Sequence, residues 1–429
     1  MTQAHFTFLI LALMAAGFVS QKIPSYVTAL CGALILTGAG TLPMAAAFAG
    51  FANPTLVLFA GMFVIGDALF RTGLANALGD WAVRRMGHRE RPLLWGTMTV
   101  SALLSTVASN TATTAALIPL ILSVCAKAGI SASKLLMPMA FTTGYGGISA
   151  LIGTPPNMIV SETLRVAGRM PFGFFEFAWV GVPIALVGML YMDLIGRRLL
   201  PGTRAAVSAA GDAAGGTGGL ADPGSRGKIK MGICGFILGA VVIAMALNRP
   251  GLSVEFVAVV GAVVCVLTGC VSGKEAIESI EWETLILFGG MFAVAAAMEK
   301  SGASALIAQG LLKVSAFTTE PHAVVAGVLA LNMFLGLFLS NTACAVLLAP
   351  IGMSLAAGIG ADPRAILMTI AVASSCSFLS PVSTPPNILV WGPGRYRFSD
   401  YVKVGSGLSV VCIATAVAII PWIWPLYPR

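Results

Sequence analysis

Two short polar motifs occur twice in this chain, each time in the same order. Ser-Asn-Thr stands at residues 109–111 and again at 340–342, and Thr-Pro-Pro-Asn stands at 154–157 and again at 384–387. The motifs are 45 residues apart in the first copy (109 to 154) and 44 in the second (340 to 384). A repeat of two motifs at nearly constant spacing indicates an internal duplication.

The residue types in these motifs suit the binding of small ions. Serine, threonine and asparagine supply hydroxyl and amide groups, and each motif interrupts an apolar run, which frees backbone N–H and C=O groups at helix ends. Oxygen atoms bind a small hard cation, whereas a helix N-terminus, with a charge of about +0.5, favours an anion. The motifs contain no Lys, Arg or His. They therefore predict an anion site whose charge is balanced by bound cations.

Ser105 lies one helical turn before Ser109, on the same face of the predicted helix. We assign its hydroxyl to a first cation site, with oxygen atoms from Asn110 and Gly153. The residue equivalent to Ser105 in the second copy is Gly336, which has no side chain. A second cation site must then depend more on carbonyl groups, on Asn341 and on the region of Ser383, and we expect the two sites to differ in affinity.

Composition places these motifs in a membrane protein. Of the 429 residues, 57% are hydrophobic and only 10% are charged, against about 25% charged in soluble proteins. The mean hydropathy is +0.92. The net charge of +8 comes from Lys and Arg in short loops between apolar runs, the pattern of membrane topology rather than of nucleic-acid binding. The eight cysteines show no metal-ligand or disulfide spacing.

The apolar runs predict about ten transmembrane helices and two re-entrant hairpins in an all-α fold. The expected crossings are at 6–20, 25–42, 54–78, 134–163 and 174–196, then at 230–247, 253–271, 284–299, 364–391 and 404–425. The hairpins are expected at 93–126 and 322–357, each from two helices of about 15 residues that meet at Ser-Asn-Thr. Because five crossings per half is an odd number, the two halves must be inverted repeats.

The domain plan follows from this arrangement. The first repeat covers residues 1–200 and the second covers 228–429, and the glycine-rich stretch 201–227 between them is expected to be a flexible linker. Placing the basic loop around Arg84, Arg85 and Arg89 in the cytoplasm puts most Lys and Arg residues, and the linker, on the inner side. The first hairpin then enters from the cytoplasm and the second from outside.

The paired motifs resemble those of the divalent anion/sodium symporter family, within the ion transporter superfamily, and the similarity covers essentially residues 20–425. The resemblance implies a homodimer in the inner membrane, with a scaffold and a moving transport unit that work as an elevator. It implies substrate contacts at Ser109, Asn110, Thr111, Thr154, Pro155, Ser340, Asn341, Thr342, Thr384 and Pro385. It implies sodium as coupling ion, bound at Ser105, Asn110, Gly153, Asn341 and Ser383.

Several substrates and two other classes of protein remain as alternatives. We expect sodium-coupled symport of a C4-dicarboxylate such as succinate, with sulfate or another inorganic oxyanion as the second choice. A metalloid-oxyanion extruder of the same superfamily is expected to carry acidic residues in its hairpins, and the hairpins here contain none. A membrane-embedded enzyme would need a nucleophile with its base, or a metal-binding set. The sequence contains neither HExxH nor GxSxG, so we expect no enzymatic activity.

Acidic residues inside apolar runs are candidates for a functional role by default. Asp67 and Asp193 are such residues, but each is followed four positions later by an arginine, Arg71 and Arg197. We therefore expect both to form structural ion pairs along one helix face.

Overall fold

A computed structural model provides the structure of the chain. It describes residues 2–20, 22–75, 77–79, 85, 89–201, 225–247, 252–303, 306, 320–381 and 383–427. Within these ranges the regular secondary structure is entirely helical, as the all-α prediction requires. Nearly all of the stretch expected to be a linker, residues 202–224, lies outside the described residues.

The described helices fall into two series. The first consists of α1 (Gln3–Ser20), α2 (Ser25–Gly38), α3 (Met44–Ala49), η1 (Gly50–Ala52), α4 (Pro54–Arg71), α6 (Glu90–Val107), α7 (Asn110–Ala128), α8 (Ser133–Gly147), α9 (Pro155–Val166), α10 (Ala178–Tyr191), η2 (Met192–Gly196) and α11 (Arg197–Leu199). The second consists of α12 (Ser225–Leu247), α13 (Val254–Leu267), α14 (Gly273–Glu278), α15 (Trp282–Ser301), α17 (Pro321–Leu335), α18 (Asn341–Ile359), α19 (Pro363–Ser375), α20 (Pro385–Gly394) and α21 (Phe398–Ile423).

Packing between helices repeats as the sequence does. Helix α4 packs on α13, and its counterpart α15 packs on α2. In the same way α9 packs on α18, whereas α20, the counterpart of α9, packs on α7. Each of these contacts joins a helix of the first half to a helix of the second. The equivalent contact joins the counterparts of the same two helices, each in the other half. The two repeats therefore interlock about a pseudo-twofold axis, as expected for inverted repeats.

Length and hydropathy identify a multi-pass membrane protein. Among the described residues, seven helical stretches are long and apolar enough to cross a membrane, and five more apolar helices have 10–17 residues. The predicted total of about ten crossings stays a prediction. Many large apolar side chains point outward, among them Phe236, Leu267 and Trp422, because lipid rather than water is the solvent they are suited to.

The helix breaks fall at the repeated motifs. Helix α6 ends at Val107 and α7 begins at Asn110, while α17 ends at Leu335 and α18 begins at Asn341. Three of these four helices are longer than the 15 residues expected. Helix α6 begins at Glu90, before the expected start of the hairpin, and α7 and α18 each continue through an internal proline, Pro119 and Pro350. The run expected as one crossing at 134–163 breaks between α8 and α9, directly before Thr-Pro-Pro-Asn.

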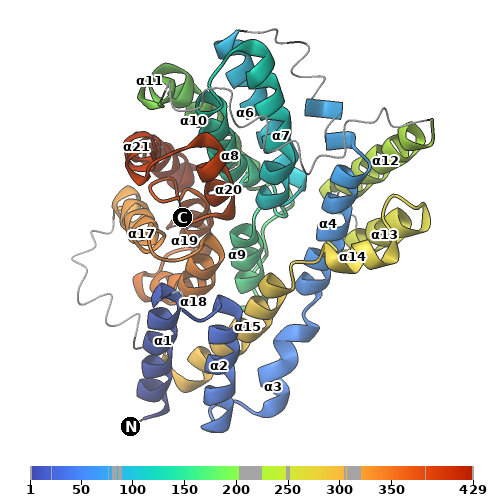
Figure 1. Ribbon diagram of the computed structural model, residues 1–429. Helices are drawn as coiled ribbons and strands as arrows, with labels where there is room; N and C mark the ends of the chain where they lie inside the picture. The colour runs from blue at the N-terminus through green and yellow to red at the C-terminus, as the bar shows by residue number, and fades with distance from the viewer. Residues whose placement is uncertain are drawn as a thin grey trace.

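The helices form two groups that have few contacts with each other. The outer group comprises α1–α4 and α12–α15, and the motif group comprises α6–α11 and α17–α21. Figure 1 shows most of the outer group along the lower and right side of the molecule and the motif group at the upper left. Contact between the groups is made chiefly by α4 against α7 and by the equivalent pair, α15 against α18.

Glycines allow the helices of the outer group to pack closely. A Cβ atom added to Gly61 on α4 would lie 2.9 Å from the carbonyl carbon of Ala258 on α13. A Cβ added to Gly290 on α15 would lie 3.1 Å from the carbonyl carbon of Ala29 on α2. The α4–α13 contact and its equivalent, the α15–α2 contact, therefore have the same close approach of backbones. These two contacts join the first repeat to the second within the outer group.

Candidate substrate and cation site

Four helix N-termini begin at the repeated motifs. Ser109 caps α7 by accepting a hydrogen bond from the Ala112 N–H at 3.3 Å, and Ser340 caps α18 by accepting one from Ala343 at 3.3 Å. Both serines thus act as N-caps, while their hydroxyl hydrogens remain able to donate. Thr154 and Thr384 precede α9 and α20 in extended conformation, and neither side chain makes a cap bond. Neither hydroxyl group is therefore used for capping, and each can still donate its hydrogen to a ligand.

Residues of both halves build this region together. Helix α9 packs against α18 and α19, and α20 packs against α7 and α8. The Ser375 hydroxyl, at the end of α19, donates to the Thr154 hydroxyl at 3.4 Å. Each Thr-Pro-Pro-Asn helix therefore begins beside the hairpin of the opposite repeat, so the predicted substrate residues of the two copies share one region of the molecule.

Oxygen atoms of Asn110 and Thr143 lie around Ser105, one of the residues predicted for the first cation site. The buried Ser105 hydroxyl forms a short contact with the side-chain oxygen of Asn110 and lies 2.8 Å from the carbonyl oxygen of Thr143. A Cβ atom placed on Gly147 would lie 2.8 Å from Oδ1 of Asn110 and 2.9 Å from the carbonyl oxygen of Gly153. The absence of a side chain at residue 147 thus lets Oδ1 of Asn110, the Gly153 carbonyl oxygen and the methyl group of Thr154 approach the backbone of α8 closely. With the Ser105 hydroxyl in contact with Asn110, the three predicted residues form a cluster of oxygen atoms beside Gly147.

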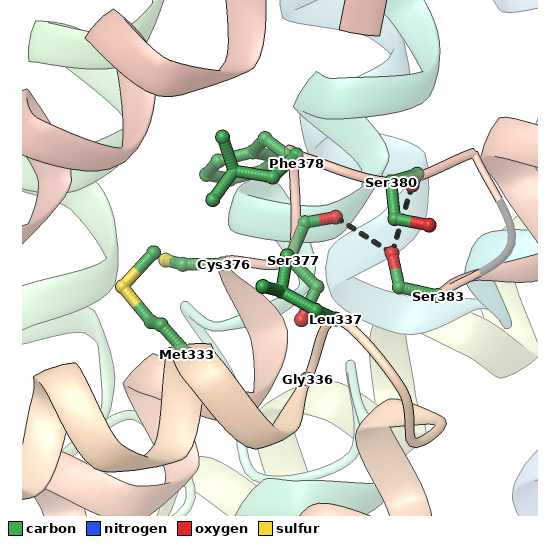
Figure 2. Close-up of a pocket in the computed structure, with 9 residues that line it drawn as sticks. Met333, Gly336, Leu337, Cys376, Ser377, Phe378, Ser380 and Ser383 are labelled. Carbon is green, nitrogen blue, oxygen red and sulfur yellow. Dashed lines mark hydrogen bonds between the residues drawn. The ribbon is translucent and has the colours of Figure 1, made fainter. Parts of the chain in front are cut away.

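Asn341 supplies an unpaired oxygen at the second tip. Its Oδ1 atom is buried and has no hydrogen-bond partner in the described structure. A buried oxygen without a donor costs free energy unless something binds it, and a cation would do so. Ser383 and Gly336 line one small pocket beside this tip (Figure 2). The residues predicted for the second cation site therefore lie in the region where an acceptor is left open.

The asparagine of each Thr-Pro-Pro-Asn motif has a role that the sequence analysis did not assign. The Asn157 amide donates to the carbonyl oxygens of Ile148 and Ala150, at 3.0 and 2.8 Å. Asn387 donates to the carbonyl oxygens of Ser377 and Ser380, at 3.4 and 3.1 Å, and the bond to Ser380 is the exact equivalent of the one to Ala150. These side chains hold the non-helical segment before each helix in place. The signal in the sequence was the recurrence of Asn at the same position in both copies.

The remaining predicted substrate residues lie in the first turns of the same helices. Thr111 and Thr342 are half-buried on α7 and α18, and Pro155 and Pro385 begin α9 and α20, where a missing N–H costs nothing. All four residues therefore lie at the helix starts that the motifs form.

Glu281 is a further residue that the sequence analysis missed. It precedes α15 of the outer group, and its carboxylate interacts with the hydroxyl groups of Ser109 and Thr284. The outer group therefore presents an acidic group to the tip of the first hairpin. It precedes α15 as Asn53 precedes α4, but in the register that pairs Gly61 with Gly290 its equivalent is Ala52, so the repeat gave no signal for it.

Asp67 and Asp193 form ion pairs, as expected. Asp67 pairs with Arg71, which also binds Glu275 at 2.8 Å. The fully buried carboxylate of Asp193 lies 3.9 Å from Arg197, but its principal partner is Arg91, at 2.6 Å. In the parts of the chain that the structure describes, no group of three or more His, Cys, Asp or Glu residues could hold a metal ion.

Two interlocked repeats, with helices broken at matching polar motifs in a multi-pass membrane fold, define a secondary transporter rather than an enzyme. The profile of the citrate transporter family (CitMHS) matches residues 15–371 and 313–428. The chain therefore belongs to this family of the ion transporter superfamily, and the resemblance to divalent anion/sodium symporters is confirmed.

Curated relatives match nearly the whole chain. An uncharacterized transporter of Escherichia coli, YfbS, is 26% identical over 97% of this chain and 98% of its own length. An uncharacterized transporter of Haemophilus influenzae is 29% identical over 94% of this chain and 88% of its own. The sodium-dependent dicarboxylate transporter SdcS of Staphylococcus saprophyticus is 24% identical over 96% of this chain and 84% of its own.

Solved structures of two membrane transporters have the same fold. The YdaH transporter of Alcanivorax borkumensis superimposes with a TM-score of 0.64, at 17% identity and over 100% of both chains. MtrF of Neisseria gonorrhoeae, described as one of a class of antimetabolite efflux pumps, superimposes with a TM-score of 0.65, at 13% identity and over 98% of this chain and 95% of its own. At these identities the likeness concerns the fold alone.

Proposed function

We propose that this protein is a sodium-coupled symporter that imports a small divalent anion, with a C4-dicarboxylate such as succinate as its substrate, across the inner membrane. The observation that carries the proposal is the cluster of oxygen atoms beside Gly147, to which Ser105, Asn110 and Gly153 contribute. The three residues supply hydroxyl, amide and carbonyl oxygens but no carboxylate, and such neutral ligands suit a monovalent cation better than a divalent one.

The anion site rests on four helix N-termini. Together they offer at most about +2 of charge, at the starts of α7, α9, α18 and α20. The motifs add hydroxyl donors but no Lys, Arg or His. Two sodium ions bound beside the tips would add the charge that a dianion needs. Anion binding then becomes conditional on sodium, which is the physical basis of the coupling.

A dicarboxylate is favoured over sulfate by the symmetry of the site. Each repeat contributes one Ser-Asn-Thr tip and one Thr-Pro-Pro-Asn helix start, so two similar anion-binding surfaces face a shared region. A C4-dicarboxylate offers one carboxylate to each surface, whereas sulfate has a single centre of charge. The name of the SdcS relative, a sodium-dependent dicarboxylate transporter, supports the same substrate class.

The proposal includes an elevator movement of the motif group against the outer group in a homodimer. The sparse contact between the two groups, chiefly α4 on α7 and α15 on α18, supports relative movement. The internal close packing of the outer group at Gly61 and Gly290 supports its role as the fixed part.

Uptake of labelled succinate into proteoliposomes, with sodium replaced by potassium in the control, tests the coupling. A thermal-shift screen of the purified protein against succinate, citrate and sulfate, with and without sodium, tests the substrate, because ligand binding raises stability by RT ln(1 + [L]/Kd). Stabilisation by succinate that requires sodium is the expected result. Stabilisation by sulfate alone would indicate that sulfate, not a dicarboxylate, is the substrate. Uptake driven only by a pH gradient would indicate that the proton, not sodium, is the coupling ion.

A further inference from the structure

The two repeats differ at two equivalent pairs of positions. Four residues before Ser-Asn-Thr stands Ser105 in the first repeat and Gly336 in the second, and seven residues before Thr-Pro-Pro-Asn stands Gly147 in the first and Ser377 in the second. The serine and the glycine have exchanged places between the hairpin and the helix break. We propose that Ser377 supplies the hydroxyl ligand of the second cation site, in place of the one that Gly336 lacks.

The geometry of the pocket beside Gly336 supports this exchange. A Cβ atom on Gly336 would lie 2.9 Å from the Ser377 hydroxyl oxygen, so this oxygen occupies space that a side chain at residue 336 would need. Figure 2 shows the Ser377 side chain reaching toward the backbone of Gly336, in a pocket that Ser380 and Ser383 also line. The hydroxyl thus reaches the hairpin from the opposite wall of the pocket.

The Ser377 hydroxyl is able to bind a cation. It donates its hydrogen to the Ser374 carbonyl oxygen at 3.3 Å, which leaves its lone pairs free to face the pocket. Ser383 donates to the carbonyl oxygens of Ser377 and Ser380, at 3.1 and 2.9 Å, so its own lone pairs remain as well. Two hydroxyl oxygens therefore stand on the wall that faces Gly336.

The first repeat indicates where Asn341 stands relative to Ser377. A Cβ on Gly147, the residue equivalent to Ser377, would lie 2.8 Å from Oδ1 of Asn110, the residue equivalent to Asn341. The inference extends this relationship to the second repeat, where Ser377 follows α19, which ends at Ser375, and it places the Ser377 hydroxyl on the side of the Asn341 amide. The Oδ1 atom of Asn341 is the buried oxygen that has no hydrogen-bond partner. A cation between these two oxygens satisfies both.

This inference rests on the proposed sodium coupling and changes one expectation drawn from the sequence. The sequence analysis expected an imbalance between the cation sites because Gly336 offers no hydroxyl. With Ser377 as a ligand, each site has one hydroxyl group near its asparagine. The hairpin supplies this hydroxyl in the first repeat, and the segment after α19 supplies it in the second. The two sites then differ in the direction from which the ligand comes, not in whether it is present.

The test compares single and exchanged variants in succinate uptake measured against sodium concentration. Ser377→Ala should raise the half-saturating sodium concentration by roughly threefold to tenfold, equivalent to about 0.7–1.4 kcal/mol of binding free energy. The double variant Gly336→Ser with Ser377→Gly recreates the arrangement of the first repeat and should bring the curve back toward that of the unmodified protein. Ser354→Ala, which removes a hydroxyl bonded to the Pro350 carbonyl on α18, is the matched control and should leave the curve unchanged.

The outcomes separate this inference from the proposed function. If the unmodified protein takes up succinate without regard to sodium, the proposed coupling itself is wrong. If uptake depends on sodium but Ser377→Ala has the same sodium curve as Ser354→Ala, Ser377 is not a ligand and this inference alone is overturned. Should Ser377→Ala fail to fold, the exchanged double variant decides, because it keeps one hydroxyl in the site. A sodium curve for the double variant close to the original supports the inference, and a strongly weakened one contradicts it.

Discussion

The hydroxyl of Ser375 lies 3.4 Å from the hydroxyl of Thr154, although the two residues belong to different repeats. Ser375 is the last residue of α19, and Thr154 directly precedes α9. A Cβ added to Gly144 on α8 would lie 3.3 Å from the Ser375 carbonyl oxygen, so the backbones of the two repeats also approach closely here. The position of the Thr154 hydroxyl therefore depends on how the repeats are packed together.

Replacing Thr154 by valine should weaken anion binding with little effect on folding. Valine keeps the shape of the side chain and removes only the hydroxyl, which makes no cap bond. Loss of one hydrogen bond to a charged ligand corresponds to about 1.5–3 kcal/mol, so the KM for succinate should rise by roughly tenfold or more. Thr163→Val on the same helix, which removes a bond to the Ile159 carbonyl, is the control and should leave KM unchanged. An unchanged KM for Thr154→Val would remove this residue from the substrate site.

Ser105→Ala should shift the sodium dependence of uptake to higher concentration. The variant removes the hydroxyl that joins Asn110 to the Thr143 carbonyl, and one ligand to a hard cation is lost. A shift of roughly tenfold in half-saturating sodium corresponds to about 1.4 kcal/mol. The matched control is Ser101→Ala, one turn earlier on α6, because Ser101 is equally buried and donates only to the Met98 carbonyl. Equal sodium curves for the two variants would make Ser105 a packing residue.

Gly147→Ala should block the first cation site almost completely. The added methyl group would lie 2.8 Å from Oδ1 of Asn110, 2.8 Å from the methyl carbon of Thr154 and 2.9 Å from the Gly153 carbonyl oxygen, so it would push apart the oxygen atoms assigned to the cation. Sodium-dependent uptake should fall to background while the protein remains folded in detergent. For Gly232→Ala on α12, where an added Cβ meets nothing within 4 Å, full uptake is expected. Normal sodium-dependent uptake by Gly147→Ala would show that the cation binds elsewhere.

The repeat and the helical spacing predicted that Ser105 and Asn110 lie together, and the structure places their side chains in contact. The sequence could not predict the Thr143 carbonyl, because a backbone oxygen is present at every residue and only the fold decides where it points. From the sequence we expected the two cation sites to differ in affinity, because Gly336 has no side chain. Ser377 gave no signal, since it is distant in sequence from residue 336 and serine is common. Only the structure brings Ser377 within reach of Gly336.

The fold was predictable to a similar degree. The duplication predicted two equivalent series of helices, and the polar motifs predicted where the helices break. The exchange of partners between the repeats, such as α9 with α18 and α20 with α7, was not predictable from spacing. Packing between distant helices depends on side-chain shape and on glycine contacts, such as that of Gly61 with Ala258, which the linear pattern does not contain.

A disulfide between Gly66 and Ala108 should stop transport by joining the two groups of helices. Gly66 lies on α4 of the outer group, and Ala108 lies at the tip between α6 and α7. A Cβ on Gly66 would be 3.6 Å from the Cβ of Ala108, within the range of about 3.5–4.5 Å that disulfides require. If the motif group moves as an elevator, oxidation of the Gly66→Cys, Ala108→Cys double variant should abolish succinate uptake, and reduction should restore it.

The single variants Gly66→Cys and Ala108→Cys control for the chain's own eight cysteines and should keep their uptake under oxidising conditions. Sodium-dependent stabilisation by succinate should persist in the oxidised double variant, because the cross-link lies between the groups and not across the cluster of oxygen atoms beside Gly147. Full uptake by the cross-linked protein, with disulfide formation verified by mass spectrometry, would mean that α4 and the first tip do not separate during transport. In that case a local opening of the hairpins, rather than movement of the whole motif group, would have to give access to the site.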